Sequence, residues 1–112
     1  MKRVLISAAA AGAALTMMAA PAFADVIDGI WCYSDGRSLS IDGPTIITPG
    51  GNQISGNYSR HAFDYKVPAN EPGAGANVNM ILLNEETVNL WLGSALPEPA
   101  AVQIWRRCKP VA

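Results

Sequence analysis

The sequence predicts an all-β protein, a small antiparallel up-and-down barrel of seven or eight short strands closed by one disulfide. Short apolar runs are separated by glycine and proline after residue 24, and no helical period survives between them. Asp-Gly pairs recur every seven residues, the spacing of five strand residues plus a two-residue hairpin turn. The two cysteines lie near the two ends of this β-patterned region.

Residues 1–24 have the pattern of a cleavable export signal. Lys2 and Arg3 precede an apolar run over residues 4–20, and Ala-Phe-Ala at 22–24 places small residues where signal peptidase reads them. The run is near the lower limit for a membrane span, so a retained anchor is the weaker alternative. We expect cleavage after residue 24 and a periplasmic or secreted product with no stable membrane anchor.

Cleavage would leave residues 25–112, which is enough for a single small β domain. Without Lys2 and Arg3, six of the eight basic residues remain against nine acidic ones, a net charge of about −3. This charge disfavours a nucleic-acid partner. A single histidine and two widely spaced cysteines do not make a zinc pattern, and we expect neither metal nor cofactor.

Cys32 and Cys108 are predicted to form a disulfide, because an even cysteine count is typical of small exported domains. The long loop that they close would contribute roughly 4 kcal/mol in the chain-entropy model. The bond would join the first strand to the last, which closes a barrel and removes both sheet edges. Two free thiols and a two-sheet β-sandwich are the alternatives.

The Asp-Gly turns also predict which side chains face the core. A two-residue turn at Asp35-Gly36 would set Cys32 opposite Leu39, and a one-residue slip would reverse that face. Trp31 would then lie on the opposite face. The predicted core side of the first three strands is Ile30, Cys32, Leu39, Ile41 and Ile46.

The later strands are predicted from similar patterns. Residues 53–67 are too long for one flat strand, so we expect a bend or bulge near Ser59, followed by alternation that puts His61, Phe63, Tyr65 and Val67 on one face. A hairpin around residues 84–86 would align Val78, Met80 and Leu82 with Val88, Leu90 and Leu92. In the last strand, residues 101–108, Trp105 and Arg107 share one face and Ile104 lies on the other.

No group of residues has the pattern of a catalytic site, so we expect a protein that is not an enzyme. His61 has no Gly-x-Ser-x-Gly nucleophile elbow to serve and is interpreted as structural. Adjacent Glu85 and Glu86 at a hairpin tip point apart, which does not suit acid–base catalysis. Asn77, Asn79 and Asn89 beside Trp91 are either a solvated sheet face or a weak sugar-binding strip.

Two groups of residues are candidates for binding. Trp31, Trp105 and Arg107 lie at odd separations from the cysteines, so they are expected on the face opposite the disulfide, either as a strand-locking cluster or as a partner or ligand patch. Glu71 and Glu98 lie in two proline-rich loops, residues 68–76 and 93–100. Both loops are expected at the same end of the barrel, where they are either simple connections or a recognition rim.

Gly29-Ile30-Trp31 on the first strand, with Arg106 and Arg107 on the last, resembles the Gly-x-Trp motif and late-strand arginine of lipocalins. In that family the arginine packs across an inward-pointing tryptophan and closes one barrel end. The chain also resembles small exported barrels that share this opening motif, such as the bacterial metalloprotease-inhibitor family. The chain departs from both: it is short for a lipocalin cup, and it lacks a clear counterpart of the inhibitors' local disulfide and N-terminal arm. An inward Trp31 would also contradict the register predicted above.

Size, export and the absence of a catalytic set favour a non-enzymatic protein-binding or inhibitor-like module of the cell envelope, directed at an envelope protein or hydrolase. The alternatives are a carrier of a small apolar ligand, of lipocalin type, and a structural envelope protein. Interior volume discriminates between them. A carrier needs a cavity of a few hundred cubic ångströms, whereas large side chains would fill a non-carrier barrel of this size.

Overall fold

The computed structural model describes residues 26–93 and 96–109, so the predicted export signal lies outside the described residues. Within them the chain forms antiparallel strands and one 3-10 turn, η2. No helix in this part of the chain is long and apolar enough to span a membrane. The elements are β1 (Gly29–Cys32), β2 (Ser38–Asp42), β3 (Thr45–Ile47), β4 (Gln53–Ser55), β5 (Asn57–Ser59), β6 (Ala62–Lys66), β7 (Asn77–Asn84), β8 (Thr87–Leu92), η2 (Pro99–Ala101) and β9 (Gln103–Arg107).

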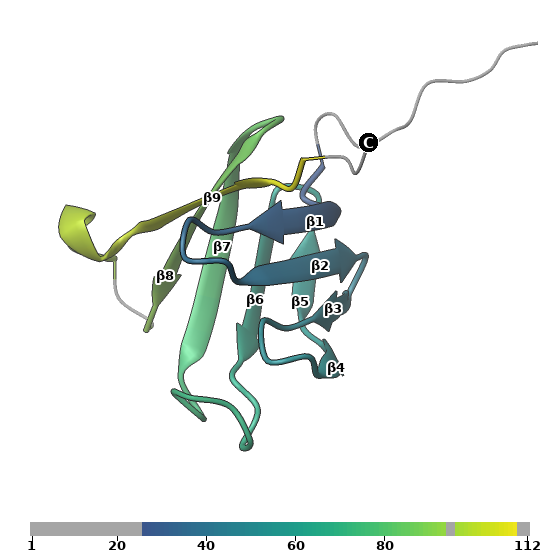
Figure 1. The fold of residues 1–112 in the computed structure, drawn as a ribbon, viewed down its shortest axis with the longest axis vertical. Coiled ribbons are helices and arrows are strands. Elements are labelled where there is room, and N and C mark those ends of the chain that lie inside the picture. The colour runs from purple at the N-terminus through teal and green to yellow at the C-terminus, as the bar shows by residue number, and fades with distance from the viewer. Residues whose placement is uncertain (1–25, 94–95, 110–112) are drawn as a thin grey trace, which may run out of the picture.

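The nine strands form one sheet in the order β4-β3-β2-β1-β9-β8-β7-β6-β5, which curls into a nearly closed barrel (Figure 1). The first strand pairs with the last, and every other pairing joins strands that follow one another in the chain. The predicted all-β, antiparallel up-and-down barrel is therefore confirmed. It forms a single sheet and not the alternative sandwich of two.

The strand count exceeds the predicted seven or eight because residues 53–66 form three strands. The chain bends at Gly56, so that β4 pairs with β3 while β5 pairs with β6. A Cβ at Gly56 would lie 2.5 Å from Cε1 of Phe63, so only glycine fits at this crossing. The bend predicted near Ser59 is present as the tight turn that joins β5 to β6, whereas the additional bend at Gly56 was not predicted.

The predicted register of the first hairpin was wrong by one residue. Trp31, and not Cys32, pairs with Leu39, because the turn is a three-residue loop closed by the Tyr33 amide donating to the Arg37 carbonyl. Gly36 occupies the left-handed position of this loop with φ 99°. Trp31 therefore points inward and is fully buried, whereas Ile30 is 59% exposed.

The predicted cross-strand pairs of the β7–β8 hairpin are confirmed. Val78 pairs with Leu92, Met80 with Leu90 and Leu82 with Val88, although the turn uses two residues and an irregularity near Leu83 in place of a three-residue loop. The barrel interior is formed by inward side chains from seven strands and by Ile27. The buried apolar residues are Ile27, Trp31, Leu39, Ile41, Ile46, Phe63, Tyr65, Val78, Met80, Val88, Leu90 and Trp105.

Cys32 and Cys108 form the predicted disulfide, with their Cα atoms 5.0 Å apart. The bond lies where β1 pairs with β9, and the Cys108 amide donates to the Ile30 carbonyl at 3.0 Å. The covalent link thus secures the junction between the two ends of the chain. The pairing that it secures leaves neither β1 nor β9 as a free edge, and the two ends of the sheet order are β4 and β5.

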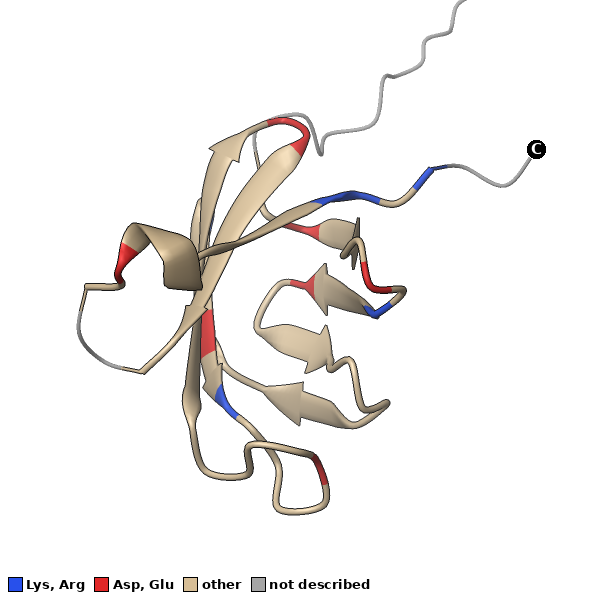
Figure 2. Ribbon diagram, turned by 60° about the vertical axis from the view of Figure 1, so that its left-hand side comes forward, with Lys and Arg blue, Asp and Glu red and all other residues tan. Residues whose placement is uncertain are grey.

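The alternating strand directions give the barrel two different ends. The N-terminal segment and the β2–β3, β5–β6 and β7–β8 turns lie at one end, which we call the closed end. The longer β1–β2, β3–β4, β6–β7 and β8–β9 connections lie at the other, the open end. In Figure 1 the β7–β8 turn is at the top and the β6–β7 loop at the bottom. Figure 2 shows that most charged residues lie in these connections and at strand ends.

Candidate functional site

Trp31 and Arg107 seal the closed end of the barrel. They are cross-strand partners, and the guanidinium carbon of Arg107 lies 4.4 Å from the centroid of the Trp31 ring. The same guanidinium donates to the backbone carbonyls of Val26 and Asp28, each at 2.8 Å, and to that of Glu85. Arg107 therefore ties the N-terminal segment and the β7–β8 turn to the barrel wall.

The local sequence around Trp31 is adapted to this arginine. Gly29 has φ 131°, and a Cβ there would lie 2.5 Å from Nη1 of Arg107. Glycine therefore leaves room for the guanidinium to pass over the first strand. The Trp31 indole N–H donates to the Ile27 carbonyl at 2.8 Å, so its polar atom is satisfied inside the barrel. The arrangement is a plug made of core side chains and backbone.

Trp105 lies inside the barrel toward the other end. Its ring stacks on Tyr33 with centroids 5.1 Å apart, and the guanidinium of Arg37 lies 5.5 Å from its centroid. The Trp105 indole N–H donates to Oε1 of Gln103 at 3.0 Å. Trp31 and Trp105 are 0% and 1% exposed, so these indoles do not form an exposed patch. The Trp31–Arg107 contact joins β1 to β9, whereas Trp105 contacts Tyr33 and Arg37, so the three predicted residues do not form one cluster.

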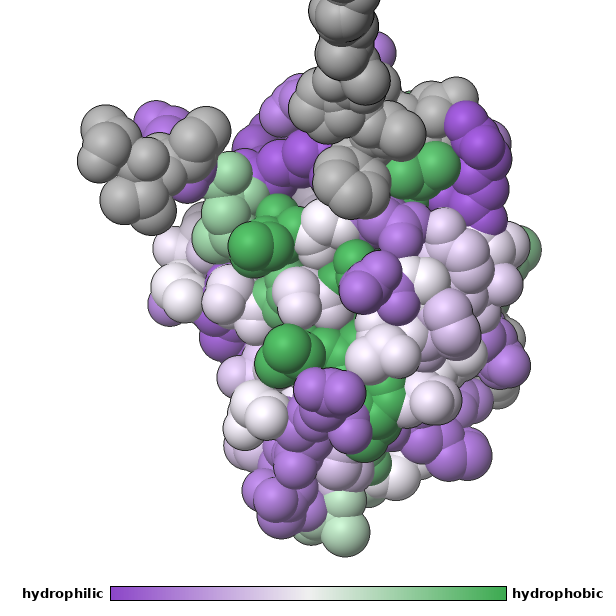
Figure 3. Space-filling view, turned by 90° about the vertical axis from the view of Figure 1, so that its right-hand side faces the viewer, coloured by the Kyte–Doolittle hydropathy of each residue, from purple (hydrophilic) through white to green (hydrophobic). Residues whose placement is uncertain are grey.

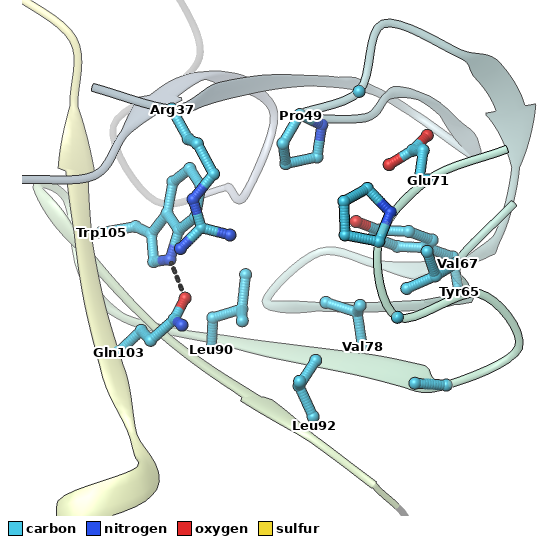
Figure 4. A pocket seen from close by; sticks show the side chains of 14 residues that line it. Arg37, Pro49, Tyr65, Val67, Glu71, Val78, Leu90, Leu92, Gln103 and Trp105 are labelled. Atoms are coloured by element: carbon cyan, nitrogen blue, oxygen red, sulfur yellow. Dashed lines mark hydrogen bonds between the residues drawn. The ribbon is translucent and has the colours of Figure 1, made fainter. Parts of the chain in front are cut away.

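A cavity of about 310 Å³ opens between the loops of the open end (Figure 4). Its inner wall consists of buried core side chains, and its outer wall comes from the loops between strands. Apolar and aromatic groups predominate, and four polar side chains lie among them: Arg37, Tyr65, Glu71 and Gln103. The lining residues are Arg37, Pro49, Gly50, Tyr65, Val67, Glu71, Pro72, Gly73, Ala76, Val78, Leu90, Leu92, Gln103 and Trp105.

Tyr65 is the deeply buried polar side chain of this cavity. Its inward position on β6 leaves it only 6% exposed, and Figure 4 shows its hydroxyl oxygen directed into the cavity. Among the described residues this hydroxyl has no hydrogen-bond partner. Burial raises the pKa of Tyr65 to about 12; the Glu71 carboxylate contributes in the same direction and Arg37 opposes it. The hydroxyl therefore remains a neutral donor at physiological pH.

Glu71 has a structural role in the cavity wall. Its Oε2 accepts hydrogen bonds from the Thr48 hydroxyl and from the Asn52 side chain, and its methylene and carboxylate atoms cover Gly50, where a Cβ would clash. These contacts fasten the β6–β7 loop to the β3–β4 turn. Glu71 is thus placed at the cavity, but its carboxylate is partly occupied by the protein itself.

Glu98 is exposed and precedes η2, and it is not among the cavity residues. The two loops that carry Glu71 and Glu98 do follow strands of the same direction, as predicted, because β6 and β8 are both antiparallel to β7. The structure therefore brings Glu71 and Trp105 to the open end. It places Trp31 and Arg107 at the closed end and leaves Glu98 outside both groups.

The remaining sequence candidates are dispersed. His61 is exposed in the β5–β6 turn, and Glu85 and Glu86 are exposed in the β7–β8 turn. The strip of Asn77, Asn79 and Asn89 lies on the outer face of the sheet, where Asn79 of β7 is the cross-strand partner of Trp91 in β8. Among the described residues there is no group of three or more His, Cys, Asp or Glu side chains that could hold a metal ion.

Sequence reasoning missed Tyr65, Arg37 and Gln103 as cavity residues. Tyr65 was predicted to share a face with Phe63. A tyrosine on the inward face of a strand places its hydroxyl inside the barrel, where the hydroxyl needs a hydrogen-bond partner. Arg37 and Gln103 gave no such signal, since Arg37 lies in the β1–β2 connection and Gln103 at the start of β9, and only the closed barrel brings both to the cavity. Scans of protein-family models, curated proteins and solved structures find no match for this chain.

Proposed function

We propose that the protein is a binding module that takes a small, mostly apolar molecule into the open end of its barrel. The observation that carries this proposal is the cavity of about 310 Å³ with core side chains as its inner wall. A barrel of this strand number and strand length has enough large side chains to fill itself. A volume at the lower end of the range for ligand pockets therefore favours a carrier over a filled barrel.

The asymmetry of the two ends supports the same proposal. The Arg107–Trp31 plug and its backbone hydrogen bonds close one end, so a molecule enters and leaves through the other. Three connections, β1–β2, β3–β4 and β6–β7, line the mouth. Among the described residues, the side-chain hydrogen bonds that join these connections are those of Glu71 and Asn52. A rigid cup with adaptable loops at its rim is the usual arrangement of a binding site on a β scaffold.

The size of the cavity limits the ligand. A water-sized group occupies about 30 Å³, so the cavity has room for a ligand of on the order of ten to fifteen non-hydrogen atoms. A bicyclic aromatic molecule fits this limit, and a full-length fatty acid does not. The resemblance to lipocalins stays a prediction, and the inward Trp31 with Arg107 across its ring agrees with what that resemblance implies.

A protein-binding or inhibitor-like role also stays a prediction. It would need an exposed recognition surface, and on the face seen in Figure 3 apolar side chains appear as separate spots among polar ones. Export to an oxidising compartment agrees with the Cys32–Cys108 disulfide. The ligand would then be a molecule met outside the cytoplasm.

The test uses 2-ethylnaphthalene, an uncharged hydrocarbon of suitable size, with binding measured by equilibrium dialysis. Val78→Phe places a ring in the cavity and should lower binding at least tenfold. Ile81→Phe adds the same ring on the outer face of the same strand, where Ile81 is 44% exposed, and should leave binding unchanged.

If Val78→Phe unfolds, Leu92→Trp gives the same test from the rim, where Leu92 is 58% exposed and lines the cavity. A wild-type protein that does not bind the hydrocarbon, or plugged and control variants that bind it equally well, would overturn the proposed function.

A further inference from the structure

The unpartnered hydroxyl of Tyr65 is unusual for its depth of burial. Most buried side-chain polar atoms have a hydrogen-bond partner, because leaving one unpaired sacrifices the bond it had with water. Tyr65 is only 6% exposed, and its hydroxyl faces the cavity. No acceptor among the described residues forms a hydrogen bond with this hydroxyl. Whatever occupies the cavity therefore meets this hydroxyl.

The other polar groups at the cavity are largely committed to the protein. Arg37 forms an ion pair with Asp35 at 2.7 Å and stacks over Tyr33 and Trp105. Gln103 uses its amide oxygen to accept from Trp105, which leaves its N–H₂ as a donor. Glu71 already accepts two hydrogen bonds.

The charge around the cavity is unfavourable for an anion. One cation, Arg37, faces two carboxylates, its own partner Asp35 and the cavity residue Glu71. An anionic ligand would have to displace Asp35 from Arg37 while lying near Glu71. A cationic ligand would bury an ammonium group beside a carboxylate whose Oε2 already has two donors, and a buried charge without full pairing is costly. Both considerations favour an uncharged molecule.

We propose that the ligand is an uncharged molecule with a flat apolar body and one hydrogen-bond acceptor, such as an aryl or alicyclic carbonyl compound, whose oxygen accepts from the Tyr65 hydroxyl. This inference rests on the proposed function, since it names the chemistry of the same cavity. Trp105, Leu90 and Val78 supply the flat apolar contact. Tyr65 supplies the donor, and the N–H₂ group of Gln103 is a second donor in the same lining.

The test compares matched naphthalene probes that differ only in the group at position 2: acetyl, ethyl, carboxylate and aminomethyl. Each is titrated into the wild type and into Tyr65→Phe, which keeps the ring and removes the hydroxyl. Tyr58→Phe is the matched control, because the Tyr58 hydroxyl donates to Asp28 at the closed end.

We expect 2-acetonaphthone to bind most tightly to the wild type, and Tyr65→Phe to weaken it about tenfold while leaving 2-ethylnaphthalene unchanged. Tyr58→Phe should affect neither probe. Equal binding of the ketone to wild type and Tyr65→Phe, or tighter binding of the carboxylate or the amine, would overturn this inference while the proposed function stands. Failure of all the probes to bind would overturn both.

Discussion

Tyr33, which directly follows β1, stacks on Trp105 of β9 with ring centroids 5.1 Å apart. On the same two strands, Trp31 and Arg107 are cross-strand partners and plug the closed end. One strand junction therefore supplies the plug at one end and the cavity wall at the other. The disulfide lies on the opposite, outward face of this junction. Stability and the candidate binding site are thus built from adjacent residues of β1 and β9.

The close approach of Arg107 to Gly29 predicts a large cost for Gly29→Ala. The substitution forces a side chain into positive φ and into contact with the guanidinium, and we expect a loss of about 3 kcal/mol in the free energy of unfolding. Gly36→Ala shares the positive φ but has open space around it, so it should cost about 1–2 kcal/mol. Urea denaturation of both variants measures the difference.

Gly29→Ala can be repeated in an Arg107→Ala protein, which separates the backbone strain at Gly29 from the steric conflict with the guanidinium. There Gly29→Ala should cost no more than Gly36→Ala, since the guanidinium is gone. An unchanged cost of Gly29→Ala in that background would show that Arg107 does not pass over Gly29 as described.

The disulfide should contribute strongly to stability because it closes a loop with a sequence separation of 76 residues. The double variant Cys32→Ala, Cys108→Ala should lose roughly 2–5 kcal/mol in the free energy of unfolding relative to the oxidised protein. Denaturation with and without reductant gives the same comparison for the wild type. A double variant as stable as the oxidised protein would contradict the role assigned to this bond.

His61 and Phe63 should differ sharply although they are two residues apart. Phe63 is 1% exposed and packs edge-on against Tyr58 and Tyr65, so Phe63→Ala should cost about 3–5 kcal/mol. His61 is exposed in a turn, and His61→Gln should change stability by less than about 0.5 kcal/mol. Thermal or urea unfolding tests both, and similar losses in the two variants would contradict the assigned positions.

Removing the Tyr65 hydroxyl should make the ligand-free protein more stable. Tyr65→Phe deletes a buried polar group without a partner among the described residues, so the free energy of unfolding should rise by up to about 1 kcal/mol. A loss of more than about 1 kcal/mol on this substitution would indicate that the hydroxyl is satisfied in the free protein, and the cavity would lose its ligand-directed donor.

The alkaline dependence of stability provides a second measurement on the same variant. The folded-state pKa of Tyr65, about 12, lies above its ordinary value of 10.0, so the unfolded chain loses this proton first. The wild type should therefore lose stability as pH rises from about 10 to 12, whereas Tyr65→Phe lacks this contribution. The stability difference between them should grow over that interval, and a constant difference would contradict the burial of the phenol.

The sequence predicted the fold well because its signals were local: Asp-Gly turns, alternation and two cysteines. It failed at the first turn, where Ser34-Asp35-Gly36 and Asp35-Gly36 are both sound hairpin loops and only the burial of Trp31 decides between them. The bend at Gly56 was likewise not predicted, since the need for glycine arises from Phe63 on the neighbouring strand.

The candidate site was less predictable than the fold. Trp105 and Glu71 were singled out, but as parts of two separate surfaces. Their common cavity exists because the β1–β2, β3–β4 and β6–β7 connections meet at one barrel end, which depends on the tertiary structure. The unpartnered state of the Tyr65 hydroxyl is a property of all its neighbours at once, and no pattern in the chain encodes it.

The central claim, a ligand site at the open end, is tested most directly by the indole N–H resonances of the tryptophans. Trp105 donates its indole proton to Gln103 at the cavity, whereas Trp31 donates its own to Ile27 at the closed end. Titration with 2-acetonaphthone, followed by ¹H–¹⁵N correlation spectra, should shift the Trp105 resonance saturably and leave that of Trp31 in place. An unmoved Trp105 resonance at saturating probe, or equal shifts of both, would contradict the claim.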